Sequence, residues 1–197
     1  MPEHHPSDAT LACHAAGALP APAAAAVSLH LRACPFCRAA VREAEAAAAA
    51  VFAEAEPAPM CDGALAATLR RIAAGPAPIP EAPPPPDLSE GGMDWGGFGV
   101  RRRLLSRDGG SRLWLLRLEP GAAVPWHTHT GTELTLFVRG RFRDRSGAYE
   151  PGDLREYTDG EADRLECVGD GAGLGLLAVE GPLRYRHWAA RLLLPNY

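Results

Sequence analysis

The sequence lacks the features of several large protein classes. It has no long basic run and its formal net charge is −4, so direct nucleic-acid binding has little electrostatic support. Residues 1–5 do not show the positively charged and then apolar layout of a secretory signal. The longest apolar run, residues 46–53, is mostly alanine and too short to cross a bilayer. We therefore expect a soluble, cytoplasmic protein that has no membrane partner.

Cysteine is too scarce and too unevenly placed for a disulfide framework. The 197 residues contain 5 cysteines, an odd number: Cys13, Cys34, Cys37, Cys61 and Cys167. In a reducing compartment, a close cysteine pair is more often a metal site or a redox switch than a structural crosslink. The chain also shows no internal repeat of the solenoid type.

The composition divides the chain into two parts. Residues 1–75 are rich in alanine and carry helix punctuation, whereas residues 93–197 are rich in Gly, Leu, Arg and aromatics. Between them, residues 76–92 include a proline-rich stretch that can neither continue a helix nor join a sheet ladder. We therefore predict two small domains joined by a polyproline-like linker, a multidomain α + β chain.

The first part predicts four helices. Ser7 or Asp8 is expected to cap the first helix, which ends near Gly17. Cys34 is expected to cap the third helix and Asp62 the fourth. The other predicted helices cover residues 22–31, 35–56 and 63–74.

The second part predicts short strands separated by glycine turns. Close spacing of such strands favours a sandwich or a barrel. The predicted strands cover residues 112–118, 133–139, 141–143, 153–157, 164–168 and 174–179.

A histidine and two cysteines between the second and third helices form the first chemical motif. His30, Cys34 and Cys37 have the spacing His-x3-Cys-x2-Cys. The cysteines lie at a helix start, and the histidine lies in the last turn of the helix before it, so all three can reach one ion. Nitrogen and sulfur ligands at this reach suit zinc. His5 is the best candidate for the fourth ligand, and His4 is a plausible rival.

Two other interpretations of the cysteine pair are weaker. A thioredoxin-like redox pair would need a preceding strand, and none is predicted. Alternatively, Cys34 could only cap the helix while Cys37 packs as a small apolar residue. The position of His30 favours a metal site. Cys13, His14 and Cys61 are expected to be structural rather than ligands.

These residues resemble a known family. A His-x3-Cys-x2-Cys motif between two helices of a small helical domain is the signature of zinc-binding anti-sigma factors. The early histidine before a Ser-Asp cap and the attached C-terminal domain look like the ChrR branch of that family. The resemblance implies that His5, His30, Cys34 and Cys37 hold Zn²⁺. It also implies that the N-terminal domain binds an extracytoplasmic-function (ECF) sigma factor.

The second part contains a motif that resembles the first cupin motif. Gly121, His127, His129, Glu133 and Gly140 match its fixed positions. Residues two apart on a strand point to the same face, so both histidines can enter a barrel. The glutamate completes a two-histidine, one-carboxylate set. The resemblance implies a cupin fold, a double-stranded β-helix or jelly-roll barrel.

The second cupin motif departs from the family pattern. Residues 147–153 fit its opening turn, but the family then expects an inward histidine about ten residues later. This chain offers Asp163, Arg164, Glu166 and Cys167 instead, and His187 is expected at the outside or the end of the barrel. Cys167 is expected to pack as a buried strand residue. We still predict a second divalent metal in the barrel, with zinc favoured over iron, manganese and nickel; the competing interpretation is a metal-free scaffold.

The predicted function is regulatory and the chain is expected to have no catalytic residues. By resemblance, the N-terminal domain sequesters an ECF sigma factor and the cupin receives the releasing signal, of the singlet-oxygen or peroxide class. The alternative is a cupin metalloenzyme of the non-haem iron dioxygenase kind. Its weakness is that the helical zinc domain would have no role. A storage or sugar-binding cupin is less favoured, and the oligomeric state stays open.

Overall fold

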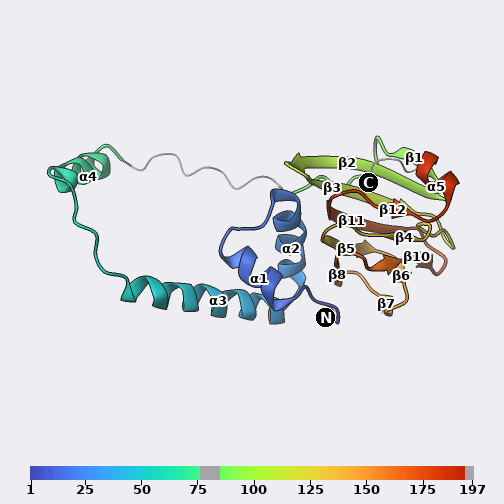
Figure 1. Ribbon diagram of the computed structural model, residues 1–197, viewed down its shortest axis with the longest axis horizontal. Coiled ribbons are helices and arrows are strands. Elements are labelled where there is room, and N and C mark those ends of the chain that lie inside the picture. The colour runs from blue at the N-terminus through green and yellow to red at the C-terminus, as the bar shows by residue number, and fades with distance from the viewer. Residues whose placement is uncertain (76–84, 194–197) are drawn as a thin grey trace.

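The computed structural model describes residues 1–75 and 85–193, with side chains described as far as residue 190. The first part is helical and the second part is built of strands, as the composition predicts (Figure 1). The N-terminal helices are α1 (Asp8–Ala15), α2 (Ala21–Ala33), α3 (Pro35–Glu54) and α4 (Ala64–Ala73), and a short helix α5 (Trp188–Leu193) follows the last strand.

The predicted helix caps are confirmed at two of three positions. The Ser7 hydroxyl accepts a hydrogen bond from the Thr10 amide, and the Cys34 thiol accepts one from the Cys37 amide. The fourth prediction was wrong: α4 is capped by Gly63 in the left-handed region, with no side-chain cap, and not by Asp62. Glycine adopts a positive φ without a steric cost, so it can end the preceding turn here.

The strands form one large sheet and two small ones, all antiparallel. The six-stranded sheet has the order β1-β2-β3-β11-β5-β8, and the small sheets have the orders β10-β6-β7 and β12-β4-β9. The strands are β1 (Asp94–Gly97), β2 (Val100–Asp108), β3 (Ser111–Leu118), β4 (His127–Thr128), β5 (Glu133–Arg139), β6 (Arg141–Arg143), β7 (Ala148–Tyr149), β8 (Leu154–Tyr157), β9 (Ala162–Asp163), β10 (Glu166–Val168), β11 (Gly173–Glu180) and β12 (Arg184–Tyr185).

Each of the six predicted strands overlaps a strand of the structure. The long strand β2 was missed, as were β1 and the two-residue strands. In β2 the arginine run at residues 101–103 interrupts the apolar alternation on which strand prediction depends. The two-residue strands carry too little pattern to be read from sequence.

The inner core of the barrel lies between the large sheet and the small ones. Trp114, Leu116 and Phe137 from the large sheet pack there with Phe142 and Cys167 from the small sheet. All five are buried. This is the jelly-roll packing that the cupin motif implies, and Cys167 has the packing role that was predicted for it.

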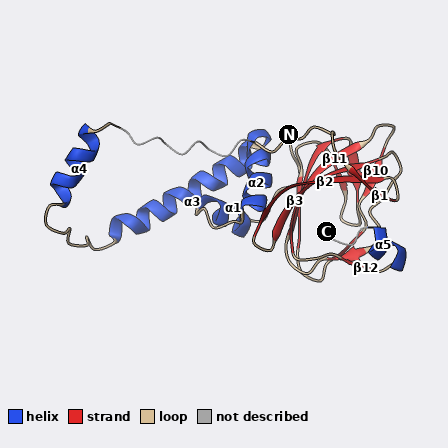
Figure 2. Ribbon diagram, turned by 90° about the horizontal axis from the view of Figure 1, so that it is seen from above, coloured by secondary structure: helices blue, strands red, loops and turns tan. Residues whose placement is uncertain are grey.

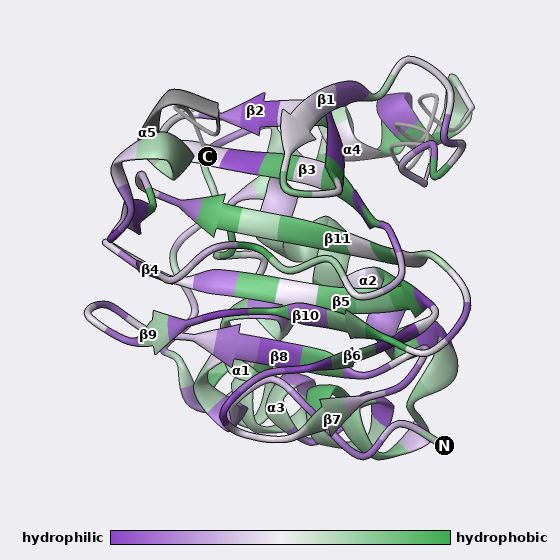
Figure 3. Cartoon of the chain, turned by 90° about the vertical axis from the view of Figure 1, so that its right-hand side faces the viewer, coloured by the Kyte–Doolittle hydropathy of each residue, from purple (hydrophilic) through white to green (hydrophobic). Residues whose placement is uncertain are grey.

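The outer face of the large sheet is covered by the N-terminal helices. Leu115 of β3 and Leu176 of β11 point away from the inner core and pack with Leu11 of α1 and Val27 of α2. Figure 3 shows these helices behind the sheet and the hydrophobic stretches along β11. Strands that are buried on both faces have continuous apolar sequence, which explains the run Leu113–Leu116. The helices and the barrel therefore share one hydrophobic core.

Polar contacts fasten the N-terminal segment to the barrel. The amides of Glu3 and His4 both donate to the Asp153 carboxylate, at 2.7 and 3.1 Å. The hydroxyl of Thr10 donates to Glu156 at 2.9 Å. Asp153 immediately precedes β8, and Glu156 lies on it. The N-terminus is thus held against the edge strand of the large sheet.

The predicted linker is described only in its second half. Residues 76–84, which hold most of the proline-rich stretch, lie outside the described residues. After them, Glu90 pairs with Arg117 of β3 and Arg139 of β5. The described end of the linker therefore lies on the barrel surface.

Helices α3 and α4 extend away from this body. Only Cys37 and Val41 of α3 are buried, both in its first two turns, and α4 has no buried residue. Figures 1 and 2 show the second half of α3 and all of α4 lying apart from the barrel. Among the described residues, no helix has both the length and the apolarity that crossing a membrane requires.

The shared core predicts that a cavity in the outer face of the sheet destabilises helices and barrel together. Leu115 is fully buried there, so Leu115→Ala should lower the free energy of unfolding by about 2–5 kcal/mol. Hydrogen exchange should show faster amide exchange in α2 as well as in β3. Leu69→Ala, on exposed α4, is the control and should change stability by less than about 0.5 kcal/mol. Unchanged exchange in α2 would contradict a shared core.

Candidate metal centres

Four side chains from three elements converge where α2 meets α3. His30 lies in the last turn of α2, Cys34 sits between the helices, and Cys37 lies in the first turn of α3. His5 reaches the same point from the segment before α1. The ligand atoms of these four residues all lie within 4.8 Å of one another.

The distances within this group match a tetrahedral zinc site. His5 Nδ1 lies 3.5 Å from Cys34 Sγ and 3.4 Å from Cys37 Sγ, and His30 Nε2 lies 3.3 Å from Cys37 Sγ. Zinc bonds of about 2.3 Å to sulfur and about 2.0–2.1 Å to nitrogen, at tetrahedral angles, place such atoms about 3.5 Å apart. The donor set and its spacing therefore fit Zn²⁺.

The protonation states also fit a cation. Burial lowers the pKa of His30, which favours the neutral imidazole that a metal ligand must be. Burial, followed by the hydrogen bond and charge of Cys34, raises the pKa of the Cys37 thiol to about 12. Two thiolates side by side in this buried place thus need a cation between them to be stable at neutral pH.

His30 is oriented by the barrel. Its Nδ1 donates to the Gly152 carbonyl at 2.8 Å, which leaves the Nε2 lone pair directed at the cysteines. Such a hydrogen bond on the far nitrogen fixes the tautomer and the ring plane of a metal-binding histidine. Gly152 belongs to the turn before β8, so a residue of the cupin part sets the geometry of the helical site.

The structure separates the two N-terminal histidines. His5 joins the group, whereas the His4 ring bonds to the Ala148 carbonyl at 3.1 Å and packs on Tyr149. Spacing alone could not make this distinction, because the two residues are adjacent. Cys13 and Cys61 are exposed and lie outside the group. Cys34 both caps α3 and belongs to the group, so these two interpretations do not exclude each other.

The barrel residues form a looser set. His127, His129 and Glu133 are all buried. Each histidine donates its Nδ1 proton to a backbone carbonyl, Pro125 for His127 and Glu161 for His129, at 2.8 and 2.9 Å. Both Nε2 atoms are then left for a ligand.

One pair of barrel atoms is short of partners. His129 Nε2 and Glu133 Oε2 lie 3.5 Å apart and are buried, and neither has a hydrogen-bond partner within the described part of the chain. Such orphaned atoms fit a cation. In that same part of the chain, only the N-terminal group has its ligand atoms as close together as 4.8 Å. A metal in the barrel is therefore a weaker inference than the N-terminal one.

A carboxylate stands where the family pattern expects the last histidine. Asp163 of β9 is buried and pairs with His127 of β4 across the small sheet. Burial, with the charges of Asp144 and Glu133, raises its pKa to about 7. The spacing from the turn at residues 151–153 points to this position, yet several residues of the sequence satisfied it equally. Arg164 is exposed and Cys167 lies in the inner core, so neither lies at the set.

The last motif glycine is required by the fold. Gly140, in the turn after β5, has a φ of 81°, and a Cβ atom there would lie 2.8 Å from the Gly173 backbone. No other residue fits that turn without a shift of β11. Gly140 therefore anchors the hairpin that carries Glu133.

Comparison with known proteins agrees with both parts. Residues 92–170 match the ChrR Cupin-like domain family. The anti-sigma-E factor ChrR of Cereibacter sphaeroides is 34% identical over 208 aligned residues, which cover 98% of this chain and 97% of that protein.

A solved structure gives the same likeness in three dimensions. The crystal structure of Rhodobacter sphaeroides SigE in complex with the anti-sigma ChrR matches with a TM-score of 0.79 and 30% identity, over 91% of this chain and 100% of that one. The likeness thus spans the helical and the barrel parts together. The chain belongs to the ChrR family of anti-sigma factors.

Proposed function

We propose that this chain is an anti-sigma factor that sequesters an ECF sigma factor through its zinc-bearing N-terminal helices. The observation that carries the proposal is the likeness to ChrR along nearly the whole chain, including the helices that lie apart from the barrel. A conserved barrel alone would support only a fold. The domain organisation of the proposal is residues 1–75 for sigma binding, 76–92 as linker and 93–197 as cupin.

The outlying helices offer a surface for the sigma factor. Large apolar side chains lie exposed along the end of α3 and along α4, where nothing among the described residues covers them. They are Val51, Phe52, Met60, Leu65, Leu69 and Ile72. Exposed apolar patches of this kind mark protein-binding sites. On α4, Leu65, Leu69 and Ile72 fall on one face, as a helix that binds in a groove requires.

Zinc is proposed as the structural ion of the N-terminal site. The helical part is rich in alanine, so its own core is small. A structural zinc contributes about 10–16 kcal/mol in small domains. Held by His5, His30, Cys34 and Cys37, the ion would fix the start of α3 against α2 and the N-terminal segment. The direction in which α3 leaves the body depends on those contacts.

The barrel is proposed as the receiver of the releasing signal, of the singlet-oxygen or peroxide class. A divalent metal, with zinc favoured, would be held there by His127, His129 and Glu133. Contacts that run from the barrel to the helical site support this role. They include the hydrogen bond from His30 to Gly152 and those from Glu3 and His4 to Asp153. A change in the turn at residues 150–153 would therefore move a ligand of the N-terminal site.

The dioxygenase alternative is not favoured. The full-length relative is named as an anti-sigma factor, a regulator and not an enzyme. The helical part would have no role in a dioxygenase. We therefore class this chain with the regulators.

The zinc proposal predicts a sharp difference between the two neighbouring histidines. His5→Ala should lower the bound zinc by about one equivalent and abolish sigma binding, because a ligand is lost. His4→Ala, which loses only the contact with Ala148 and Tyr149, is the matched control and should keep both. Zinc is measured by mass spectrometry of the intact full chain and binding by calorimetry. Full zinc in the His5 variant would remove this residue from the site.

The sigma-binding surface predicts an effect that depends on the face of α4. Leu69→Glu places a charge in the apolar stripe and should weaken sigma binding about 30-fold or more, equivalent to about 2 kcal/mol. Ala67→Glu, on the opposite face of the same helix, should change the affinity by less than about threefold. Equal effects of the two variants would show that α4 does not bind through this stripe.

The barrel proposal separates inhibition from response. His127→Ala should leave sigma binding intact, because the N-terminal site and α4 are unchanged. Sigma release under singlet oxygen or peroxide should be lost. A transcription assay with the reconstituted complex measures both. A variant that still releases the sigma factor normally would show that His127 has no part in sensing.

A further inference from the structure

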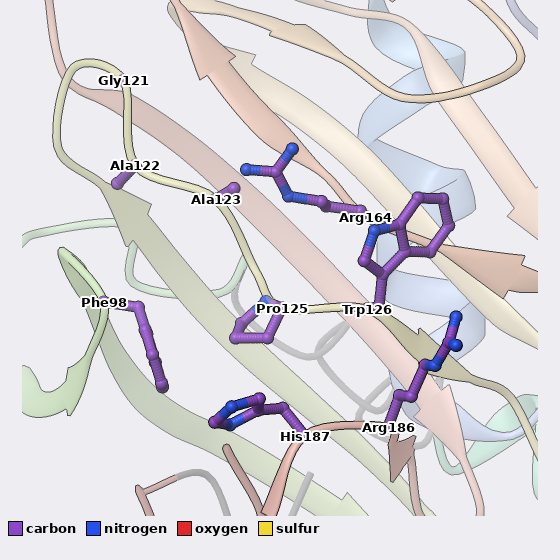
Figure 4. A pocket seen from close by; sticks show the side chains of 9 residues that line it. All are labelled: Phe98, Gly121, Ala122, Ala123, Pro125, Trp126, Arg164, Arg186 and His187. Atoms are coloured by element: carbon purple, nitrogen blue, oxygen red, sulfur yellow. The ribbon is translucent and has the colours of Figure 1, made fainter. Parts of the chain in front are cut away.

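A partly apolar pocket lies beside the barrel set at the end of the small sheets. It has a volume of about 680 Å³, which is in the range for a small-molecule site. Its floor is the loop between β3 and β4, around Ala122, Ala123 and Pro125. Figure 4 shows Phe98 on one side of Pro125 and Trp126 on the other. Both aromatic rings are partly exposed, Phe98 at 43% and Trp126 at 40%.

Two arginines at this pocket have no anionic partner. Arg164 and Arg186 line it together with His187. Across the described residues, neither guanidinium forms an ion pair with a carboxylate, although arginines elsewhere on the barrel do, such as Arg143 with Glu166. An unpaired guanidinium at a pocket offers a planar, bidentate fit to a carboxylate.

The positive rim continues toward the barrel interior. A second pocket of about 470 Å³ shares Trp126 and Arg186 with the first and adds Arg145 and Arg184. Its lining also includes His127, a residue of the barrel set. The Arg145 guanidinium lies 6.0 Å from the centre of the Trp126 ring. Four arginines thus surround Trp126 in a chain whose formal net charge is −4.

We propose that this pocket binds an amphipathic carboxylate: a monoanionic acid with an apolar body of medium length. The carboxylate lies between Arg164 and Arg186, and the apolar body covers Pro125 and the face of Phe98. The apolar floor excludes a small hydrophilic anion as the preferred ligand, because such an ion would leave the aromatic rings uncovered. The arginine pair excludes a neutral lipid, which would leave both charges unpaired.

This binding site goes beyond the proposed function, since ligand binding requires neither the sigma factor nor a metal. Its place in the fold gives it a consequence for the barrel. Trp126 precedes His127 directly, and Arg186 follows Tyr185, which pairs with His127 across β12 and β4. A ligand at Trp126 and Arg186 therefore contacts both strands that hold His127.

The test is calorimetric titration of the full-length chain with decanoate below its micellar concentration. Decanoate should bind in the micromolar to sub-millimolar range. Arg186→Gln and Arg164→Gln should each weaken binding about tenfold or more, which is the typical loss of a charge-assisted hydrogen bond. Arg107→Gln, an exposed arginine of the β2–β3 hairpin far along the chain from the pocket, is the matched control and should bind as the unmodified chain does.

Two comparisons decide the chemistry. Decanol, with the same chain and no charge, should bind at least about tenfold more weakly than decanoate; equal binding would overturn the role of the arginines. Acetate should not bind measurably; tight acetate binding would overturn the role of the apolar floor. No decanoate binding, or binding that the two arginine variants leave unchanged, would overturn the site. Sigma binding by the same variants should stay normal, so failure here and failure of the anti-sigma proposal remain distinguishable.

Discussion

The hydrogen bond from His30 to the Gly152 carbonyl is the contact on which the arrangement of the two parts depends. His30 lies at the end of α2 with one ring nitrogen directed at two cysteines, while the other is held by a turn of the barrel. The histidine is oriented by one part for chemistry in the other. A metal at that site would therefore be sensitive to the position of a barrel loop, although the proline-rich stretch divides the sequence just where two independent domains would be expected.

The hydrophobic core has the same character. Leucines on the outer face of the large sheet pack against α1 and α2, while their neighbours in sequence face the inner core. What remains free is the second half of α3 and all of α4, the helices that carry the exposed apolar residues. The molecule thus consists of a rigid body with a metal site at its surface and an outlying helical surface whose direction is set at that site. This division suits a protein that must hold a partner and also release it.

The sequence predicts the parts of this structure that depend on local pattern. The strand β5 and the start of α3 follow from alternation, proline and cap residues, and the four N-terminal ligand candidates follow from spacing. It could not predict that Leu113–Leu116 is buried on both faces, because a continuous apolar run does not say what covers it. The choice of His5 over His4 depends on the Ala148 carbonyl, which lies 144 residues away. Likewise, the position of Asp163 opposite His127 depends on a pairing between short strands that carry almost no pattern.

The most direct test of the account is the affinity of the full-length chain for the ECF sigma factor that co-purifies with it from its host, measured before and after zinc removal. The account predicts that zinc removal lowers the affinity by at least about a hundredfold, equivalent to about 2.7 kcal/mol, and that added Zn²⁺ restores it. The barrel should stay folded throughout, as judged by its near-ultraviolet circular dichroism. A zinc-free chain that binds the sigma factor with unchanged affinity would contradict the account, because the N-terminal metal site would then have no part in holding the partner.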